Sequence, residues 1–182
     1  MVNNNVSDRI NNVCGVDVDE RHPENIKEAV IIDAARRKLT ICAAESCTGG
    51  LLGGALTETP GSSSVFLGSA VCYSNEAKSR VLGVDPDLIS ASGAVSGGCA
   101  TAMAEGARRL FGADIACAVT GIAGPGGGTD EKPVGLVWFA IETPWEKAVF
   151  FRIFSGGRTE IRKRAVYTAL ETLRGSIGRK IP

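Results

Sequence analysis

The chain has 182 residues, a length that suits a single domain with one sizeable hydrophobic core. Its 20 basic and 20 acidic residues cancel, whereas sequence-independent binding of nucleic acid needs a surplus of lysine and arginine. No apolar run reaches the roughly 18 residues of a membrane-spanning helix. The polar start MVNNNVSDRINN lacks the basic and apolar regions of a signal peptide. We therefore expect binding to neither nucleic acid nor membranes.

The cysteines and the single histidine restrict the chemistry further. None of the six cysteines forms a CxxC pair, and several lie inside apolar stretches, as is typical of reduced, buried thiols in a cytoplasmic protein. Their spacing does not suit structural zinc, so we expect no metal site. The only histidine, His22, lies near the N-terminus. The cysteines are Cys14, Cys42, Cys47, Cys72, Cys99 and Cys117.

The first half of the chain predicts helices that alternate with strands. Residues 1–22 are polar and aperiodic, and we interpret them as an extension that precedes one domain of residues 23–182. Apolar residues at helical spacing predict a helix over 23–39, with Pro23 at its start. A short buried strand from Thr40, a helix over 49–57, a turn around Pro60 and a strand over 64–74 follow.

The second half ends with two consecutive strands. Helices are predicted over 75–84, over a short segment from Asp85, and over 96–112, where Gly112 ends the helix. A nearly continuous apolar strand over 113–124 runs into a glycine-rich loop. Finally come an antiparallel pair of strands, over 133–143 and 147–155, and an amphipathic helix over 158–176. This order predicts a single-domain three-layer α/β/α sandwich with a mixed, mostly parallel sheet.

Ligands of open α/β sheets bind beyond the strand ends, and three such places carry unusual residues. The first is AESCTGG, residues 44–50, where a strand ends and a helix opens. The free N–H groups of a helix start attract anions, so this turn could hold a phosphate or a developing oxyanion. The alternative is plain N-capping of the helix by Ser46 or Thr48.

The second place is YSNEAK, residues 73–78. Tyr73 ends a strand, and Ser74 or Asn75 is expected to cap the next helix. Lys78 then lies in the first helical turn, where the positive end of the helix dipole lowers the pKa of an amine. A neutral amine is what a general base requires. The alternative is an exposed lysine that reaches back to solvent.

The third place is the glycine-rich segment TGIAGPGGGT, residues 120–129. Because most of these residues lack a side chain, their backbone N–H groups can approach a phosphate closely and form a nest around it. The segment is neither a Walker A loop nor a GxGxxG turn. The alternative is a flexible hairpin loop.

Elimination narrows the choice of catalytic groups. Triads that use Ser-His-Asp or Cys-His need a histidine, and His22 lies in the extension. The GxSxG motif is missing, because Glu45 and Cys47 flank Ser46. A hydroxyl nucleophile would therefore depend on a lysine or a carboxylate as its base. SxxK is missing too, so any serine–lysine pair must form through space.

The motifs AESCTGG, YSNEAK and TGIAGPGGGTDEKPVG, in this order, resemble the CinA C-terminal domain family over about residues 25–176. The enzymatic members of that family are nicotinamide-nucleotide amidohydrolases. The resemblance implies conversion of nicotinamide mononucleotide and water to nicotinic acid mononucleotide and ammonia, in pyridine nucleotide recycling and without a cofactor. It also implies an α/β/α domain and a homo-oligomer, either a dimer or a dimer of dimers.

The resemblance also implies roles for single residues. The family's catalytic serine, tyrosine and lysine fall on Ser46, Tyr73 and Lys78. Our hypothesis is that Ser46 attacks the carboxamide carbon, and that Lys78 takes its proton directly or through the Tyr73 hydroxyl. Backbone N–H groups of residues 47–49 would stabilise the oxyanion. The expected substrate-binding residues are Thr48, Gly49, Thr120, Gly124, Gly126, Gly127, Gly128 and Arg158.

Two of these assignments keep an alternative. Arg158, which precedes the last helix, either contacts the 5′-phosphate or is an ordinary surface arginine at a helix N-terminus. The competing function is a non-catalytic nucleotide-binding regulatory module linked to competence, and a third is the hydrolysis of another small amide.

Overall fold

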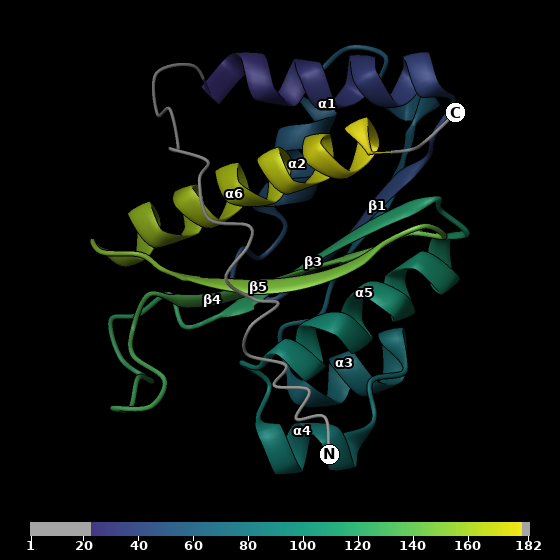
Figure 1. Ribbon diagram of the computed structural model, residues 1–182. Coiled ribbons are helices and arrows are strands. Elements are labelled where there is room, and N and C mark those ends of the chain that lie inside the picture. Colours follow the sequence, from purple (N-terminus) through teal and green to yellow (C-terminus); the bar gives the residue numbers. More distant parts are fainter. Residues whose placement is uncertain (1–22, 180–182) are drawn as a thin grey trace, which may run out of the picture.

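The computed structural model describes residues 23–179, and these form one sheet between two helical layers (Figure 1). The strand order is β2-β1-β3-β4-β5. β1 is parallel to β2 and to β3, whereas β4 is antiparallel to both β3 and β5. Only β4 in this sheet runs against the others, so the predicted mixed, mostly parallel sheet is confirmed. The strands are β1 (Ile41–Glu45), β2 (Phe66–Val71), β3 (Ile115–Gly121), β4 (Leu136–Glu142) and β5 (Lys147–Ile153).

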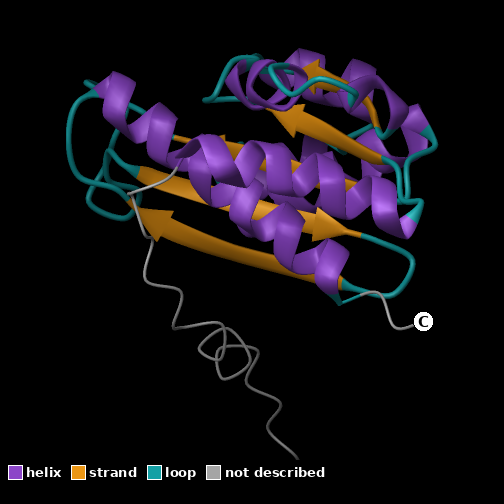
Figure 2. Ribbon diagram, turned by 90° about the horizontal axis from the view of Figure 1, so that it is seen from above, coloured by secondary structure: helices purple, strands orange, loops and turns teal. Residues whose placement is uncertain are grey.

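Helices cover both faces of the sheet, as predicted for a three-layer sandwich (Figures 1 and 2). One layer holds α1 (Pro23–Arg37), α2 (Leu51–Thr57) and α6 (Arg158–Gly178). The other holds α3 (Asn75–Leu82), α4 (Pro86–Ser92) and α5 (Gly97–Phe111). The predicted turn around Pro60 is present, and a 3-10 turn, η2 (Ser62–Ser64), follows it directly. The described helices include none that is long and apolar enough to cross a membrane.

Two hydrophobic cores follow from the alternation of side chains along each strand. In β1, Ile41 and Ala43 join the core beneath α1, α2 and α6, whereas Cys42 and Ala44 join the core above α5. Because both faces of the central strands are covered, β1 and β3 are apolar throughout most of their length.

A glycine brings α5 close against α3. A Cβ atom at Gly106 would lie 2.1 Å from the carbonyl oxygen of Leu82, far inside van der Waals contact. Only a residue without a side chain fits here, so the position of α3 depends on this glycine. Gly112 ends α5 in the left-handed conformation, as predicted from the sequence.

The parallel strands bring the three motifs to one edge of the sheet. β1, β2 and β3 end directly before Ser46, Cys72 and Ile122, and these ends are neighbours in the strand order. The antiparallel β4 begins at the same edge, and β5 ends there, because Leu136 pairs with Ile153. The start of α6 therefore reaches the same edge.

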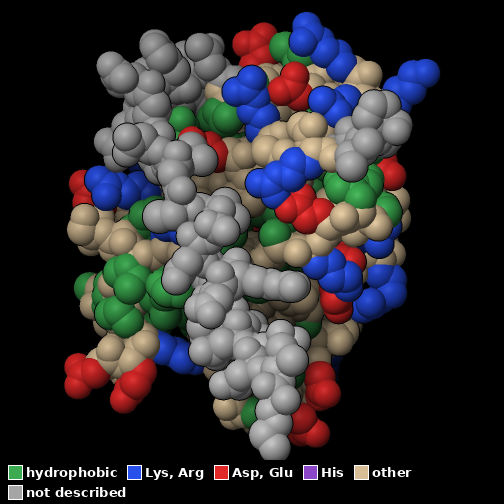
Figure 3. Space-filling model, in the orientation of Figure 1, with side chains coloured by type: hydrophobic (Ala, Val, Ile, Leu, Met, Phe, Trp, Pro, Cys, Tyr) green, Lys and Arg blue, Asp and Glu red, His purple; other side chains and the backbone are tan. Residues whose placement is uncertain are grey.

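Charges of both signs are interspersed on the face of the molecule that Figure 3 shows. This pattern agrees with the balanced composition of the chain. The predictions about His22, Cys14 and the extension of residues 1–22 fall outside the described residues.

Candidate active site

Ser46 and Lys78 meet at the carboxyl edge of the sheet. The Nζ atom of Lys78 lies 3.0 Å from the Oγ atom of Ser46, across 32 positions of sequence. The same Nζ donates to the carbonyl oxygens of Cys72 at 3.0 Å and Tyr73 at 3.1 Å. A serine–lysine pair, which the sequence allowed only through space, is thus present in the structure.

The surroundings of Lys78 favour its neutral form. The side chain is only 1% exposed, and none of the ion pairs among the described residues includes it. Burial lowers the pKa of the Lys78 amine below its usual value, because water no longer stabilises the charge. The sequence predicted the direction of this shift from the helix dipole and from burial, and burial is its largest cause in the structure.

Local structure holds Lys78 in place. The Ser74 side chain accepts from the backbone N–H of Ala77 at 3.0 Å and so caps α3, as predicted. Lys78 follows in the first turn of the helix, and its side chain reaches back to the carbonyl groups that precede the cap. Gly83 ends the helix with φ +71°. A short, doubly capped helix therefore fixes Lys78 relative to the end of β2.

Glu45, at the end of β1, organises the turn that carries Ser46. Its buried carboxylate accepts from the backbone N–H groups of Gly50, Leu52 and Gly53 at 2.8–3.0 Å, and from the Ser69 hydroxyl at 2.8 Å. The N-terminus of α2 is thus capped from within the protein. The alternative interpretation, in which Ser46 or Thr48 caps this helix, is wrong, because the N-cap residue is Gly50.

This capping also limits where an anion can bind. The N–H of Gly49 donates to the carbonyl of Ser46 at 3.1 Å, that of Gly50 to the Glu45 carboxylate at 2.9 Å, and that of Leu51 to the carbonyl of Thr48 at 3.3 Å. Within the described part of the chain, the N–H groups of Cys47 and Thr48 donate to no other residue. The backbone N–H groups of residues 47–49 were predicted to stabilise an oxyanion. Since that of Gly49 is already used, those of Cys47 and Thr48 are the two candidates.

Arg162, on α6, holds the same turn from the other side. Its guanidinium donates to the carbonyl oxygens of Cys47 at 3.1 Å and Thr48 at 2.8 Å. A Cβ atom at Gly49, whose φ is +60°, would lie 3.2 Å from this guanidinium. Gly49 therefore lets the arginine approach the backbone, and its own N–H is used within the turn. The Oγ1 atom of Thr48 is fully buried and has no hydrogen-bond partner among the described residues.

Tyr73 does not insert its hydroxyl between Ser46 and Lys78. The side chain is 62% exposed, and its hydroxyl accepts from Arg158 at 3.1 Å. The same guanidinium donates to the carbonyl oxygen of Gly124 at 2.8 Å. Arg158 thus links the segment after β2 with the glycine-rich loop after β3. These two hydrogen bonds distinguish Arg158 from a surface arginine that contacts only solvent.

The glycine-rich loop is exposed at Gly126, Gly127 and Gly128 and is anchored at both ends. Gly124 is buried with φ +77°, and a Cβ atom there would lie 2.7 Å from Val134. Farther along, Lys132 Nζ donates to the carbonyl oxygen of Ser92 at 2.6 Å. The loop is therefore tied to α4 and α6, which leaves its glycine backbone facing solvent.

Thr120, near the end of β3, is buried and donates to the carbonyl oxygen of Ala94 at 2.9 Å. This bond holds the segment between α4 and α5 against the strand. The hydroxyl that the sequence assigned to substrate is thus already used within the protein, although its oxygen can still accept a further hydrogen bond.

The cysteines near the dyad are poor nucleophiles. Burial raises the pKa of the Cys47 thiol to about 11, and it also raises the pKa values of Cys72 and Cys99. Cys42, Cys47, Cys72, Cys99 and Cys117 are free and buried. No group of histidine, cysteine and carboxylate side chains suited to a metal ion occurs among the described residues.

Comparison with known proteins identifies the family. A family model described as the CinA C-terminal domain matches residues 23–177. The chain belongs to this family. A CinA-like protein of Gemmatimonas aurantiaca is 46% identical over 157 residues, which cover 86% of this chain and 37% of that protein. The chain thus spans little more than a third of the length of this curated relative.

Solved structures of the family share the fold. The competence/damage-inducible protein CihA of Agrobacterium tumefaciens is 45% identical, with a TM-score of 0.81 over 86% of this chain and 96% of that one. The competence damage-inducible protein A of Klebsiella pneumoniae is 34% identical, with a TM-score of 0.84 over 87% and 99% of the two chains.

The sequence did not single out two residues that shape the site of this CinA C-terminal domain, Glu45 and Arg162. The role of Glu45 could have been predicted from the sequence. A carboxylate at the end of a buried strand needs hydrogen-bond donors, and the glycine-rich helix start that follows supplies them. The role of Arg162 could not have been predicted in this way, since it lies 114 positions from Thr48 in the sequence.

Proposed function

We propose that this CinA C-terminal domain hydrolyses the amide of nicotinamide mononucleotide, giving nicotinic acid mononucleotide and ammonia. The observation that carries the proposal is the 3.0 Å contact between Ser46 Oγ and the buried amine of Lys78. A serine hydroxyl is a weak nucleophile unless a base accepts its proton. A lysine with a lowered pKa, and without a carboxylate partner among the described residues, supplies that base.

The hydrogen bonds of Lys78 suit this role. A neutral amine has two hydrogens and one lone pair. The two hydrogens are donated to the carbonyl oxygens of Cys72 and Tyr73, so the lone pair points to the hydroxyl of Ser46. The direct proton transfer is therefore favoured over the route through the Tyr73 hydroxyl, which is bonded to Arg158.

The proposed reaction has two halves. Ser46 Oγ bonds to the carboxamide carbon while Lys78 takes the hydroxyl proton, and the N–H groups of Cys47 and Thr48 face the developing oxyanion. The protonated lysine then gives its proton to the departing amine, so that ammonia leaves and an acyl-serine remains. Water repeats the sequence with Lys78 as base, which releases the carboxylic acid and restores Ser46.

The phosphate end of the substrate is assigned to the glycine-rich loop and Arg158. The exposed backbone of residues 126–128 offers N–H groups without the obstruction of side chains. Arg158 is held over this loop by its bond to Gly124, and its guanidinium can add a charge-assisted contact to a phosphate.

The test is ammonia release from nicotinamide mononucleotide by the purified chain. Ser46→Ala should lower kcat by at least about a thousandfold, and Lys78→Met by about a hundredfold or more. Ser64→Ala and Lys163→Met remove an exposed hydroxyl and an exposed amine elsewhere, and both should retain full activity.

Two outcomes would count against the proposal. Turnover by Ser46→Ala at the wild-type rate would remove the nucleophile assignment. Binding of nicotinamide mononucleotide by the wild type without any release of ammonia would instead support the regulatory module. Nicotinamide riboside, which lacks the phosphate, should show a raised KM if the loop and Arg158 bind that group.

A further inference from the structure

The guanidinium of Arg162 is aimed at two consecutive peptide groups in the turn that carries Ser46. Arg162 lies near the start of α6, which packs against α2 (Figure 1). Its Nε donates to the carbonyl oxygen of Cys47 at 3.1 Å, and its Nη2 donates to that of Thr48 at 2.8 Å. Both nitrogens belong to one planar, rigid fork, so a single side chain fixes two peptide groups relative to each other.

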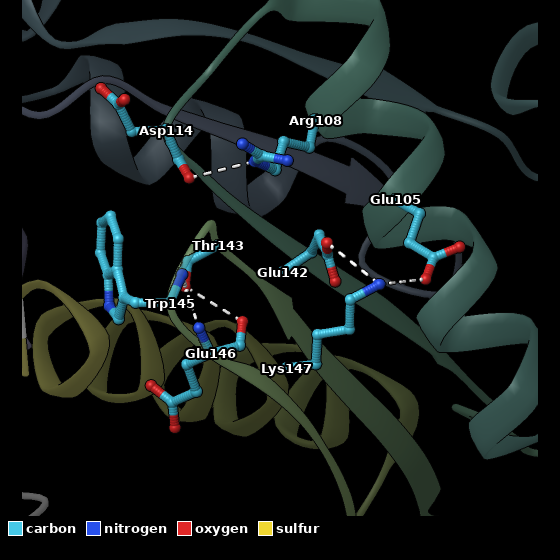
Figure 4. A network of polar contacts seen from close by, with 8 residues as sticks. All are labelled: Glu105, Arg108, Asp114, Glu142, Thr143, Trp145, Glu146 and Lys147. Carbon is cyan, nitrogen blue, oxygen red and sulfur yellow. Dashed lines mark hydrogen bonds and ion pairs between the residues drawn. The ribbon is translucent and has the colours of Figure 1, made fainter.

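The positive charge of Arg162 is not balanced by a carboxylate. None of the ion pairs among the described residues includes it. Lys147 shows the contrast, because it lies 2.8 Å from a carboxylate oxygen of Glu105 and 3.3 Å from one of Glu142 (Figure 4). The hydrogen bonds of Arg162 instead go to carbonyl oxygens, which carry only a partial negative charge. A net positive charge therefore remains beside the turn.

The bond to Cys47 acts directly on one of the two free N–H groups. The carbonyl of Cys47 and the N–H of Thr48 belong to the same peptide group, whose C–N bond has partial double-bond character. A cation bound at the oxygen draws electrons from the nitrogen and makes the N–H a stronger donor. The N–H of Thr48 donates to no other described residue, so this gain is available to a bound oxyanion.

The bond to Thr48 reaches the other free N–H group through one further hydrogen bond. The carbonyl of Thr48 shares its peptide group with the N–H of Gly49, which donates to the carbonyl of Ser46 at 3.1 Å. That carbonyl in turn shares its peptide group with the N–H of Cys47. Hydrogen bonds in such a chain strengthen one another by about 10–30% each. One guanidinium therefore polarises both N–H groups that are free to bind an oxyanion.

We infer that Arg162 is the positioning residue of the oxyanion site: it fixes the N–H groups of Cys47 and Thr48 and strengthens them as donors. This role rests on the proposed acyl transfer at Ser46, in which the oxyanion forms. Arg162 acts through the peptide groups of the turn, and it needs no contact with the substrate.

The buried carboxylate of Glu45 explains why this turn needs a cation. It accepts from the N–H groups of Gly50 and Leu52, so a negative charge already lies beside the place where an oxyanion would form. The thiol of Cys47 responds to both charges. Burial raises its pKa to about 11, and the charge of Arg162 lowers it whereas that of Glu45 raises it. Arg162 thus offsets the unfavourable effect of Glu45 on an anion at this turn.

Ammonia release from nicotinamide mononucleotide by two variants of Arg162 tests this role. Arg162→Met removes both bonds and the charge but leaves the N–H groups in place, so kcat should fall by about ten- to a hundredfold, less than when an oxyanion donor is removed outright. KM should change by less than about twofold, because the interaction strengthens only in the transition state. Arg162→Lys keeps the charge without the fork and should lie between the two. Lys163→Met changes the neighbouring exposed residue and should match the wild type.

The pH profile separates this role from an effect on the base. Burial, and not Arg162, is the main influence on the pKa of Lys78. The acid limb of kcat/KM should therefore lie at the same pH in Arg162→Met as in the wild type, at a lower plateau.

Phosphonylation of Ser46 tests the same role without the amide substrate. In the reaction with a fluorophosphonate, Ser46 Oγ bonds to phosphorus, Lys78 takes the hydroxyl proton and fluoride leaves, while the phosphoryl oxygen takes the place of the oxyanion. Mass spectrometry of the peptide that contains Ser46 measures the rate. Arg162→Met should react at least about tenfold more slowly than the wild type, and Lys163→Met at the wild-type rate.

The two reactions distinguish a failure of this role from a failure of the proposed activity. A wild type that is phosphonylated at Ser46 but releases no ammonia would remove the substrate assignment, and the labelling rates would then decide the role of Arg162. A wild type that releases ammonia, together with an Arg162→Met variant of equal kcat, would overturn the role of Arg162 and leave the activity in place. A wild type that does neither would overturn both.

Two further results would overturn the role of Arg162. A raised KM at unchanged kcat would make it a substrate-binding residue, and a shifted acid limb would make it a modulator of Lys78. Thermal unfolding shows whether each variant is folded. If Arg162→Met does not fold, Arg162→Lys decides the result, because wild-type kcat without the fork would show that the two bonds are not required.

Discussion

Lys78 Nζ and Ser46 Oγ lie 3.0 Å apart, and the other two hydrogen bonds of that amine go to backbone carbonyl groups. A charged ammonium would donate to all three oxygens, whereas a neutral amine donates to the two carbonyls and accepts from the serine. The arrangement thus accommodates both protonation states without movement of heavy atoms. A base that is repeatedly protonated and deprotonated requires this property.

The pH dependence of activity should follow this group. Since burial lowers the pKa of Lys78, the active neutral form accumulates as pH rises through that lowered value. We expect kcat/KM for ammonia release to rise with pH and then reach a plateau. Lys78→Arg keeps the charge and cannot be deprotonated, so it should be inactive across the whole range. A wild-type profile without an acid limb would contradict the assignment of Lys78 as base.

The lowered pKa of Lys78 should also make the stability of the protein depend on pH. The unfolded chain holds the Lys78 proton up to the usual pKa of 10.5, whereas the folded chain releases it at a lower pH. The free energy of unfolding of the wild type should therefore rise, relative to Lys78→Met, between the lowered pKa and pH 10.5. The gain is about 1.4 kcal/mol for each unit of the shift. Urea denaturation of both proteins at several pH values measures it, and a constant difference would contradict the shift.

Much of the fold could be predicted because hydrophobic spacing and turn residues are local signals. The apolar runs of β1 and β3, and Gly112 at the end of α5, are read directly from neighbouring residues. The start of α2 was placed two residues too early, at Gly49 instead of Leu51. The N–H groups at its start donate to the Glu45 side chain, which precedes the N-cap residue Gly50 by five positions and lies outside the positions where a local capping pattern is sought.

The approach of Ser46 to Lys78 could be predicted from the sequence, whereas the contacts of Tyr73 could not. Ser46 and Lys78 follow adjacent parallel strands, so their approach follows from the topology. Tyr73 also follows such a strand, but the direction of its side chain depends on Arg158, which is 85 positions away. Contacts of this kind result from tertiary packing, and no local pattern specifies them.

Glu45 should matter for stability as well as for the geometry of the nucleophile. Glu45→Gln replaces one acceptor oxygen by an amide that faces at least one backbone N–H group, so one or two of the four hydrogen bonds are lost, because the Ser69 hydroxyl can instead accept from the amide. We expect a loss of about 2–5 kcal/mol in the free energy of unfolding. Ser69→Ala removes one donor to the same carboxylate and should cost about 0.5–1.5 kcal/mol. Equal losses in the two variants, measured by denaturant unfolding, would show that Glu45 does not organise the turn.

Tyr73→Phe distinguishes a proton relay from a positioning role. Because the Tyr73 hydroxyl is bonded to Arg158, we expect its removal to lower kcat less than tenfold and to raise KM. Arg158→Lys should raise KM by a similar factor, since one lysine nitrogen does not reproduce the two separate guanidinium nitrogens with which Arg158 binds Gly124 and Tyr73. The double variant should be no worse than Arg158→Lys alone, because both changes break the same contact. A fall in kcat of a hundredfold or more for Tyr73→Phe alone would instead indicate a relay.

Gly106→Ala tests whether the packing of α5 sets the position of the base. The new methyl group would meet the carbonyl of Leu82 at 2.1 Å, and α3 would have to move away together with Lys78. Overpacking of this kind costs about 1–3 kcal/mol, and a displaced Lys78 should lower kcat more than it changes KM. Gly175→Ala is the matched control, because a methyl group there meets nothing within 4 Å and alanine favours a helix by about 0.5–1 kcal/mol. Denaturant unfolding and ammonia release on both variants measure the two effects. If Gly106→Ala lost stability but kept full kcat, the distance between Ser46 and Lys78 would not depend on this contact.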